Sequence, residues 1–80
     1  MSLQSKFSLE LYHARHERHY TQEQVAEAVS ISLRWYQHLE KGTFLPGSVT
    51  MLRLILFLEM DIELFREEVG LVDPISLRTR

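Results

Sequence analysis

The chain contains no cysteine and has only three glycines and two prolines in 80 residues. Without cysteine it forms neither disulfides nor thiolate metal sites, and nothing in it indicates secretion. Its longest apolar run, residues 54–58, is far shorter than the roughly 18 residues that a membrane span needs. No basic segment followed by a long apolar one marks a signal peptide. We therefore expect a cytoplasmic protein, and no motif calls for a cofactor.

A strong charge of either sign is also lacking. The sequence has nine lysines and arginines and eleven acidic residues, which gives a net charge of −2 when the histidines are neutral. A basic surface must therefore be local, and it depends partly on the protonation of the four histidines. A chain of this length forms one small domain that buries about 60–65% of its unfolded surface. Its stability must come from helix packing or oligomerisation.

The residue patterns that enzymes need are missing as well. There is no glycine-rich phosphate loop, no cysteine nucleophile and no visible pairing of a base with a nucleophile. His13, His16 and His19 recur every third residue, which raises the possibility of a metal site. The outer two diverge by about 120° around a helix, and no second cluster completes a tetrahedral site. We expect solvated surface histidines, no metal and no catalytic residue.

The most informative stretch runs from Thr21 to Gly42 and begins as a short helix. Thr21 is a good N-cap, and Gln24 three residues later completes a Thr-x-x-Gln capping box. Apolar residues then recur at helical spacing and predict a buried stripe: Val25, Ala26 and Val29.

A second helix follows after a tight turn. Ser32 is a good N-cap, and Gly42 ends the helix as a left-handed residue. Tyr36 and Leu39 share its inner face, and the outer face carries Leu33, Arg34, Gln37 and His38. Two short helices joined in this way predict a helix-turn-helix. The alternative is an ordinary pair of packed helices in a small bundle.

Three further helices complete an all-α prediction. The first starts at a Ser5 or Ser8 cap, ends near residue 18 or 19, and buries Phe7, Leu11 and Ala14. The next, over residues 49–58, is capped by Ser48 or starts with Pro46 at its first position. It is so apolar that Leu56 is expected to be surplus to the monomer core.

A fifth helix is predicted from an Asp61 cap to Gly70, with an apolar stripe formed by Ile62, Phe65 and Val69. Residues 1–70 thus make one domain. Residues 71–80 are either a tail or an arm that packs across a partner, and the sequence does not decide between them.

The span from about residue 11 to residue 65 resembles the DNA-binding domain of the lambda-repressor-like family, the Cro/CI-type or XRE family. The resemblance implies five short helices, of which the second and third form the helix-turn-helix. Spacing agrees without insertions. The matching residues are Arg15, Thr21 to Ala26, Ile31-Ser32, Tyr36, Leu39-Glu40-Lys41-Gly42, Pro46 and Leu58.

The resemblance also implies roles for individual residues. Gln22 lies where relatives contact DNA from the start of the second helix. The recognition-helix set comprises Ser32, Leu33, Arg34, Trp35, Gln37 and His38. Lys41 and Thr43 lie where the following loop approaches phosphates. Arg15 and Glu40 match a pair that often forms a buried or semi-buried ion pair between the first helix and the third.

The sequence departs from the family pattern in three ways. Ser30 replaces a glycine commonly found in the turn, so a positive φ there would strain it by roughly 1 kcal/mol. Tyr36 replaces a usually aliphatic inward residue, so its hydroxyl needs either a hydrogen-bond partner or access to solvent. Leu33 and Trp35 put apolar bulk on a face that is usually small and polar. Leu33 would contact either thymine methyl groups or another protein.

We predict a sequence-specific duplex-DNA-binding transcriptional regulator, acting as a dimeric repressor-type protein. Arg34 is the predicted base reader, because a guanidinium can donate to guanine O6 and N7; a phosphate contact or a solvated charge is the alternative. The apolar excess predicts a homodimer interface near Leu56, Met60 and Phe65, with core packing the alternative for Phe65. The competing function is an antitoxin-like or accessory protein-interaction module with little affinity for DNA.

Overall fold

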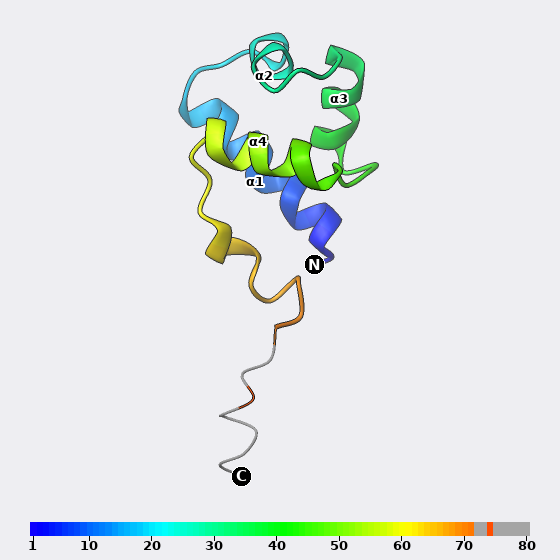
Figure 1. Cartoon of the computed structure of the whole chain (residues 1–80), viewed down its shortest axis with the longest axis vertical. Helices are drawn as coiled ribbons and strands as arrows, with labels where there is room; N and C mark the ends of the chain where they lie inside the picture. The colour runs from blue at the N-terminus through cyan, green and yellow to red at the C-terminus, as the bar shows by residue number, and fades with distance from the viewer. Residues whose placement is uncertain (72–73, 75–80) are drawn as a thin grey trace.

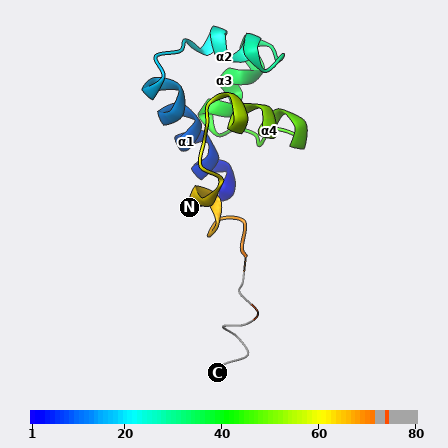
Figure 2. The ribbon, with the colours of Figure 1, turned by 60° about the vertical axis from the view of Figure 1, so that its left-hand side comes forward.

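The computed structural model describes residues 1–71 and residue 74, and in this part of the chain helices joined by turns and loops are the secondary structure, with no strand. Its elements are α1 (Leu3–Glu17), α2 (Gln22–Ala28), α3 (Leu33–Lys41), α4 (Ser48–Phe57) and the 3₁₀ turn η1 (Ile62–Phe65). The short helices α2 and α3 lie together at one end of the molecule, next to α1 and α4 (Figures 1 and 2). Within these ranges no helix is long and apolar enough to cross a membrane. The all-α prediction is confirmed.

The predicted fifth α-helix is replaced by the single turn η1. Asp61 caps it as expected, because its Oδ1 accepts a hydrogen bond from the Glu63 amide at 3.0 Å. Of the predicted stripe only Phe65 is buried, while Ile62 and Val69 are 62% and 51% exposed. A short helix is stabilised mainly by burying an apolar face, and this segment buries too little to extend it. The count of five helices is not confirmed; the described residues form four α-helices.

The predicted starts of α1 and α4 were wrong. Ser2 caps α1, its Oγ accepting from the Ser5 amide at 3.1 Å, so the helix begins before either predicted cap. Gly47 is the N-cap of α4 and supplies no side-chain hydrogen bond. Ser48 is therefore already the first helical residue, and Pro46 precedes the helix.

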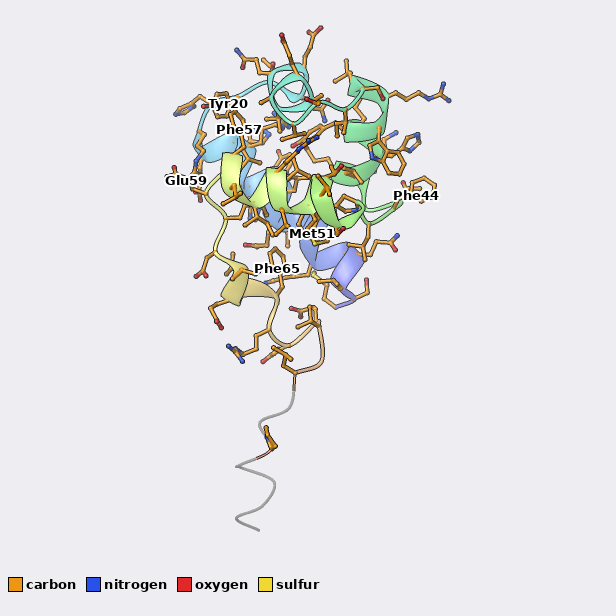
Figure 3. All side chains as sticks on the ribbon, in the orientation of Figure 1. Tyr20, Phe44, Met51, Phe57, Glu59 and Phe65 are labelled. Carbon is orange, nitrogen blue, oxygen red and sulfur yellow. The ribbon has the colours of Figure 1, made fainter. Side chains whose placement is uncertain are left out.

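The core lies where α1, α2, α3 and α4 meet. The predicted inner residues of α2 and α3 are all buried: Val25, Ala26, Val29, Tyr36 and Leu39. Phe7 of α1 packs on Phe65, with ring centroids 5.5 Å apart. Tyr20 stacks on Phe57 of α4 at 5.1 Å (Figure 3). Each fully buried large apolar side chain contributes about 1.5–3 kcal/mol, and together they fix α3 against α1.

Left-handed residues end several of the helices. Gly42 has φ +80°, which favours glycine, and a Cβ there would lie 2.9 Å from the Ser8 hydroxyl oxygen of α1, which would have to shift. His19, Ser30 and Glu59 have φ of 58°, 62° and 51°. The predicted strain at Ser30 is therefore present, at a cost of about 1 kcal/mol for a non-glycine residue.

The predicted tail or arm, residues 71–80, falls mostly outside the described residues. Only Leu71 and Pro74 of it are described. Its role stays a prediction.

Candidate nucleic-acid interface

Local hydrogen bonds set the position of α2 and α3. The Thr21 hydroxyl accepts from the Gln24 amide at 3.1 Å, and the Gln24 Oε1 accepts from the Thr21 amide at 2.8 Å. This confirms the capping box and makes Gln22 the first residue of α2. Ser32 caps α3 as predicted, its Oγ accepting from the Trp35 amide at 3.0 Å. The left-handed Ser30 lies in the turn between these two caps.

The outer side of α3 and the loop after it carry most of the predicted DNA-contacting residues. Ser32, Leu33, Arg34, Lys41 and Thr43 are exposed, whereas Gln22, Trp35, Gln37 and His38 are half-buried. Residues 21–43 contain two basic side chains, Arg34 and Lys41, against three acidic ones. One of these acids, Glu40, is neutralised by Arg15. Both basic side chains of this stretch lie on α3.

Arg15 of α1 and Glu40 of α3 form that ion pair. The guanidinium Nε and Nη2 donate to the two carboxylate oxygens at 2.8 and 2.7 Å, and the side chains are only 11% and 7% exposed. A third donor, Nη1, binds the Tyr20 carbonyl at 3.0 Å. The bidentate pair therefore fixes the C-terminal end of α3 to α1, and the third bond ties α1 to the residue before the α2 N-cap.

The surroundings of Glu40 keep it ionised. Burial acts to raise its pKa, but hydrogen bonds from Arg15, helped by Tyr36 and the Arg15 charge, bring the pKa below its usual value. The same hydrogen bonding raises the pKa of Arg15. Burial, with the neighbouring Glu40, raises the pKa of Tyr36 far above its usual value. The Tyr36 hydroxyl is close to Glu40, but no described residue meets hydrogen-bonding geometry with it.

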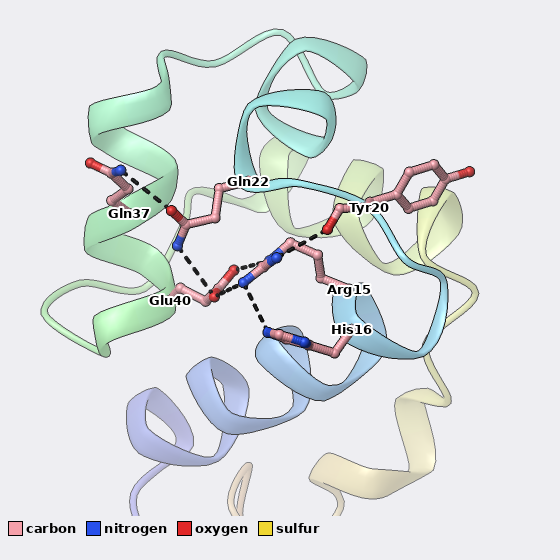
Figure 4. Close-up of polar contacts among 6 residues, drawn as sticks. All are labelled: Arg15, His16, Tyr20, Gln22, Gln37 and Glu40. Atoms are coloured by element: carbon pink, nitrogen blue, oxygen red, sulfur yellow. Dashed lines mark hydrogen bonds and ion pairs between the residues drawn. The ribbon is translucent and has the colours of Figure 1, made fainter.

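Two glutamines extend this pair to the surface of α3. Gln22 Nε2 donates to Glu40 Oε1 at 3.4 Å, and Gln37 Nε2 donates to Gln22 Oε1 at 3.3 Å. Figure 4 shows the chain of contacts from Arg15 through Glu40 and Gln22 to Gln37. With Lys41, the last three line an open depression on the surface.

Comparison with known families agrees with this geometry. A family model described as a helix-turn-helix domain matches residues 10–70, which is most of the chain. The chain belongs to the helix-turn-helix domain family of the Cro/CI or XRE type. No curated protein and no solved structure gives a significant match to it. In a helix-turn-helix domain the second helix of the motif is the recognition helix, which here is α3.

One side of the recognition helix carries an aromatic cluster made of Trp35, His38 and Phe44. Trp35 lies 5.3 Å from Phe44, and His38 lies 5.8 Å from Phe44, between ring centroids. Trp35 also packs against the core, while Phe44 is 48% exposed. The His38 Nδ1 is buried, and no described residue bonds to it. The sequence did not predict a role for Phe44, because this residue lies in a loop, where no periodic pattern marks it.

Gln4 is a second residue that the sequence reasoning missed. From the first turn of α1, its Nε2 donates to the Thr43 carbonyl at 2.9 Å and also to the Gly42 carbonyl. It therefore holds the loop that follows the recognition helix, where Thr43 lies. No local sequence signal reveals such a contact between residues so far apart in the chain.

The three predicted interface residues have different surroundings. Leu56 is 76% exposed, Met60 is half-buried, and Phe65 is only 4% exposed in the core. Phe65 therefore has no free face for a partner. Val49 and Leu52, 60% and 55% exposed, lie one to two turns before Leu56 on α4. These three residues form an exposed apolar stripe, which we call the α4 stripe.

Proposed function

We propose that this helix-turn-helix domain is a sequence-specific duplex-DNA-binding transcriptional regulator of the repressor type. The observation that carries the proposal is the exposed outer side of α3, which presents Arg34 and Lys41 on a helix of the recognition type. The major groove admits one α-helix, so an outer face of this kind can reach base edges. The ion pair behind α3 holds that helix in a fixed orientation.

The exposed residues fit distinct roles on DNA. Arg34, near the start of α3, suits bidentate readout of guanine. Lys41 and Thr43, at the other end of the helix and in its loop, suit phosphate contacts that position the domain. Leu33, 39% exposed, suits contact with a thymine methyl group. Gln22 and Ser32 are polar and adjoin this surface, where they can add backbone contacts.

A homodimer gives this small surface useful affinity. One domain makes few contacts, and dimeric helix-turn-helix proteins bind two half-sites about 34–36 Å apart, one turn of DNA. The α4 stripe is our candidate interface, because it exposes three large apolar side chains at helical spacing outside the core. Met60 can contribute at its edge.

The first test is a titration of a fluorescently labelled mixed-sequence duplex, followed by anisotropy at rising salt. We expect saturable binding near 50 mM salt that weakens steeply by 200 mM, because the release of counterions from DNA becomes less favourable as the salt concentration rises. Arg34→Ala is expected to weaken binding about tenfold, in line with a base contact. Arg66→Ala removes the same charge from the segment after η1 and should change affinity less than about twofold.

The outcomes separate the two candidate functions. No binding at low salt would overturn the DNA proposal, and equal losses in Arg34→Ala and Arg66→Ala would overturn the role of Arg34 in it. The second candidate, a protein-interaction module, is favoured by the exposed Leu33 and Phe44 beside Trp35. It predicts that a protein partner binds the wild type and Arg34→Ala but no longer binds Leu33→Ser or Phe44→Ser.

A further inference from the structure

Arg15, Glu40, Gln22 and Gln37 form a series of side-chain hydrogen bonds. Elementary hydrogen-bond chemistry determines how the two glutamine amides are oriented in it. Arg15 can only donate, and the ionised Glu40 can only accept. The Gln22 group that faces Glu40 must therefore be its NH₂, which turns Gln22 Oε1 toward Gln37. The group of Gln37 that faces this oxygen must then be its NH₂ as well, at 3.3 Å. The charge pair thus fixes the orientation of both glutamines.

This arrangement leaves a defined hydrogen-bonding pattern on the recognition helix. One N–H of Gln37 is used by Gln22, and among the described residues its other N–H and its Oε1 have no hydrogen-bond partner. Figure 4 shows that oxygen on the side away from Gln22. Reversing the Gln37 amide would place its carbonyl oxygen against the carbonyl oxygen of Gln22. The two oxygens repel each other, so this orientation is disfavoured.

We propose that Gln37 is a specificity-determining residue that reads adenine, and that Gln22, Glu40 and Arg15 are positioning residues that hold its amide for this purpose. Adenine presents an N6 donor beside an N7 acceptor in the major groove. One free acceptor and one free donor match that pair. Guanine presents two acceptors, O6 and N7, and would need a second N–H that Gln22 already occupies. The inference rests on the proposed binding of duplex DNA.

The test begins with selection of duplexes from a random pool by the wild-type protein. Affinity is then measured on four duplexes that differ only at the A·T pair assigned to Gln37. Wild type should prefer adenine there by about tenfold or more, and Gln37→Ala should reduce the preference to within about twofold. Gln22→Met should reduce it severalfold, because it removes the contact that orients the amide. Lys41→Ala is the matched control and should weaken all four duplexes equally.

A second measurement needs no DNA. In ¹⁵N-labelled protein, the Gln37 side-chain NH₂ resonances should shift in Gln22→Met and stay in place in Arg34→Ala, with circular dichroism showing that both variants remain folded. A merely structural role for Gln22 would lower thermal stability without changing the base preference.

The failures are distinguishable. Wild type that binds no duplex overturns the proposed function. Wild type that binds, with an unchanged base preference in Gln37→Ala, overturns only the assignment of Gln37. The positioning role of Gln22 is overturned by a third result. In that result Gln37→Ala loses the adenine preference, but Gln22→Met keeps it in full and leaves the Gln37 NH₂ resonances unshifted.

Discussion

Replacing Arg15 by methionine should destabilise this domain more than any surface substitution. Methionine keeps an unbranched apolar stem, so the main change is that Glu40 loses two hydrogen bonds of 2.7 and 2.8 Å. The carboxylate would stay in surroundings where its side chain is only 7% exposed. Breaking a buried pair in this way costs about 3–5 kcal/mol. A domain of this length has a total stability of roughly 4–12 kcal/mol, so the variant should be close to unfolding.

The effect of Arg15→Met on stability should also depend on pH. The pKa of Glu40 is lowered in the folded protein, whereas an unfolded glutamate titrates near 4.3, as a rough reference. Its pairing therefore stabilises the fold above that pH, and the contribution is lost as pH falls through the lower, folded pKa. In Arg15→Met the unpaired carboxylate favours its protonated form instead. The stability gap between wild type and Arg15→Met should therefore narrow as the solution is acidified.

Urea unfolding followed by circular dichroism, at pH 7 and at several acidic pH values, measures both effects. The double variant Arg15→Met/Glu40→Leu removes both charges, so its loss of stability should be well below the sum of the two single losses. Single losses under about 1 kcal/mol, additive losses, or a gap that is constant with pH would refute the reasoning.

Three further predictions concern the turns and the α4 stripe. Ser30→Gly should raise the free energy of unfolding by about 0.5–1 kcal/mol, because glycine tolerates positive φ; an unchanged melting temperature would contradict this. Gly42→Ala should lower it by more than about 1 kcal/mol, since the new Cβ combines positive φ with a close approach to Ser8, and a thermal melt that matches wild type would exclude this. Leu56→Glu should weaken self-association, measured by sedimentation equilibrium, and leave a folded monomer. The control Glu23→Gln, on α2, should leave self-association unchanged. Equal association in both variants would show that the α4 stripe is not the dimer interface.

The parts of the fold that the sequence predicted correctly depend on neighbouring residues. Thr21, Ser32 and Gly42 act on amides and carbonyls within one helical turn, so their residue types are sufficient. The buried stripes of α2 and α3 follow in the same way from helical spacing. Local chemistry of this kind can be read without knowing the rest of the molecule.

The incorrect predictions involve choices that local chemistry does not make. Ser2, Ser5 and Ser8 are all acceptable caps, and the start of α1 is set by what the earlier residues contact elsewhere. The segment after Asp61 has helical spacing, but only Phe65 finds a surface to pack on, so the helix stops after one turn. In both cases tertiary packing overrides the local preference.

The candidate site shows the same division. The resemblance pointed to Arg15 and Glu40 as partners, and the structure places them in contact. The link from Glu40 to Gln37 could not be predicted, because it needs the relative placement of α2 and α3. Trp35 was expected on the DNA-facing side, yet it is partly buried against the core and lies beside Phe44. Whether it touches DNA stays a prediction.

The contacts made by the first turns of α1 have a practical consequence for how this domain is delimited. The family match begins at residue 10, but Phe7 is 1% exposed in the core, and Gln4 holds the loop after the recognition helix. A protein trimmed to the matching region would lose a core aromatic residue and release that loop. The boundary of sequence similarity therefore lies inside the boundary of the folding unit, and the residues before it act directly on the recognition surface.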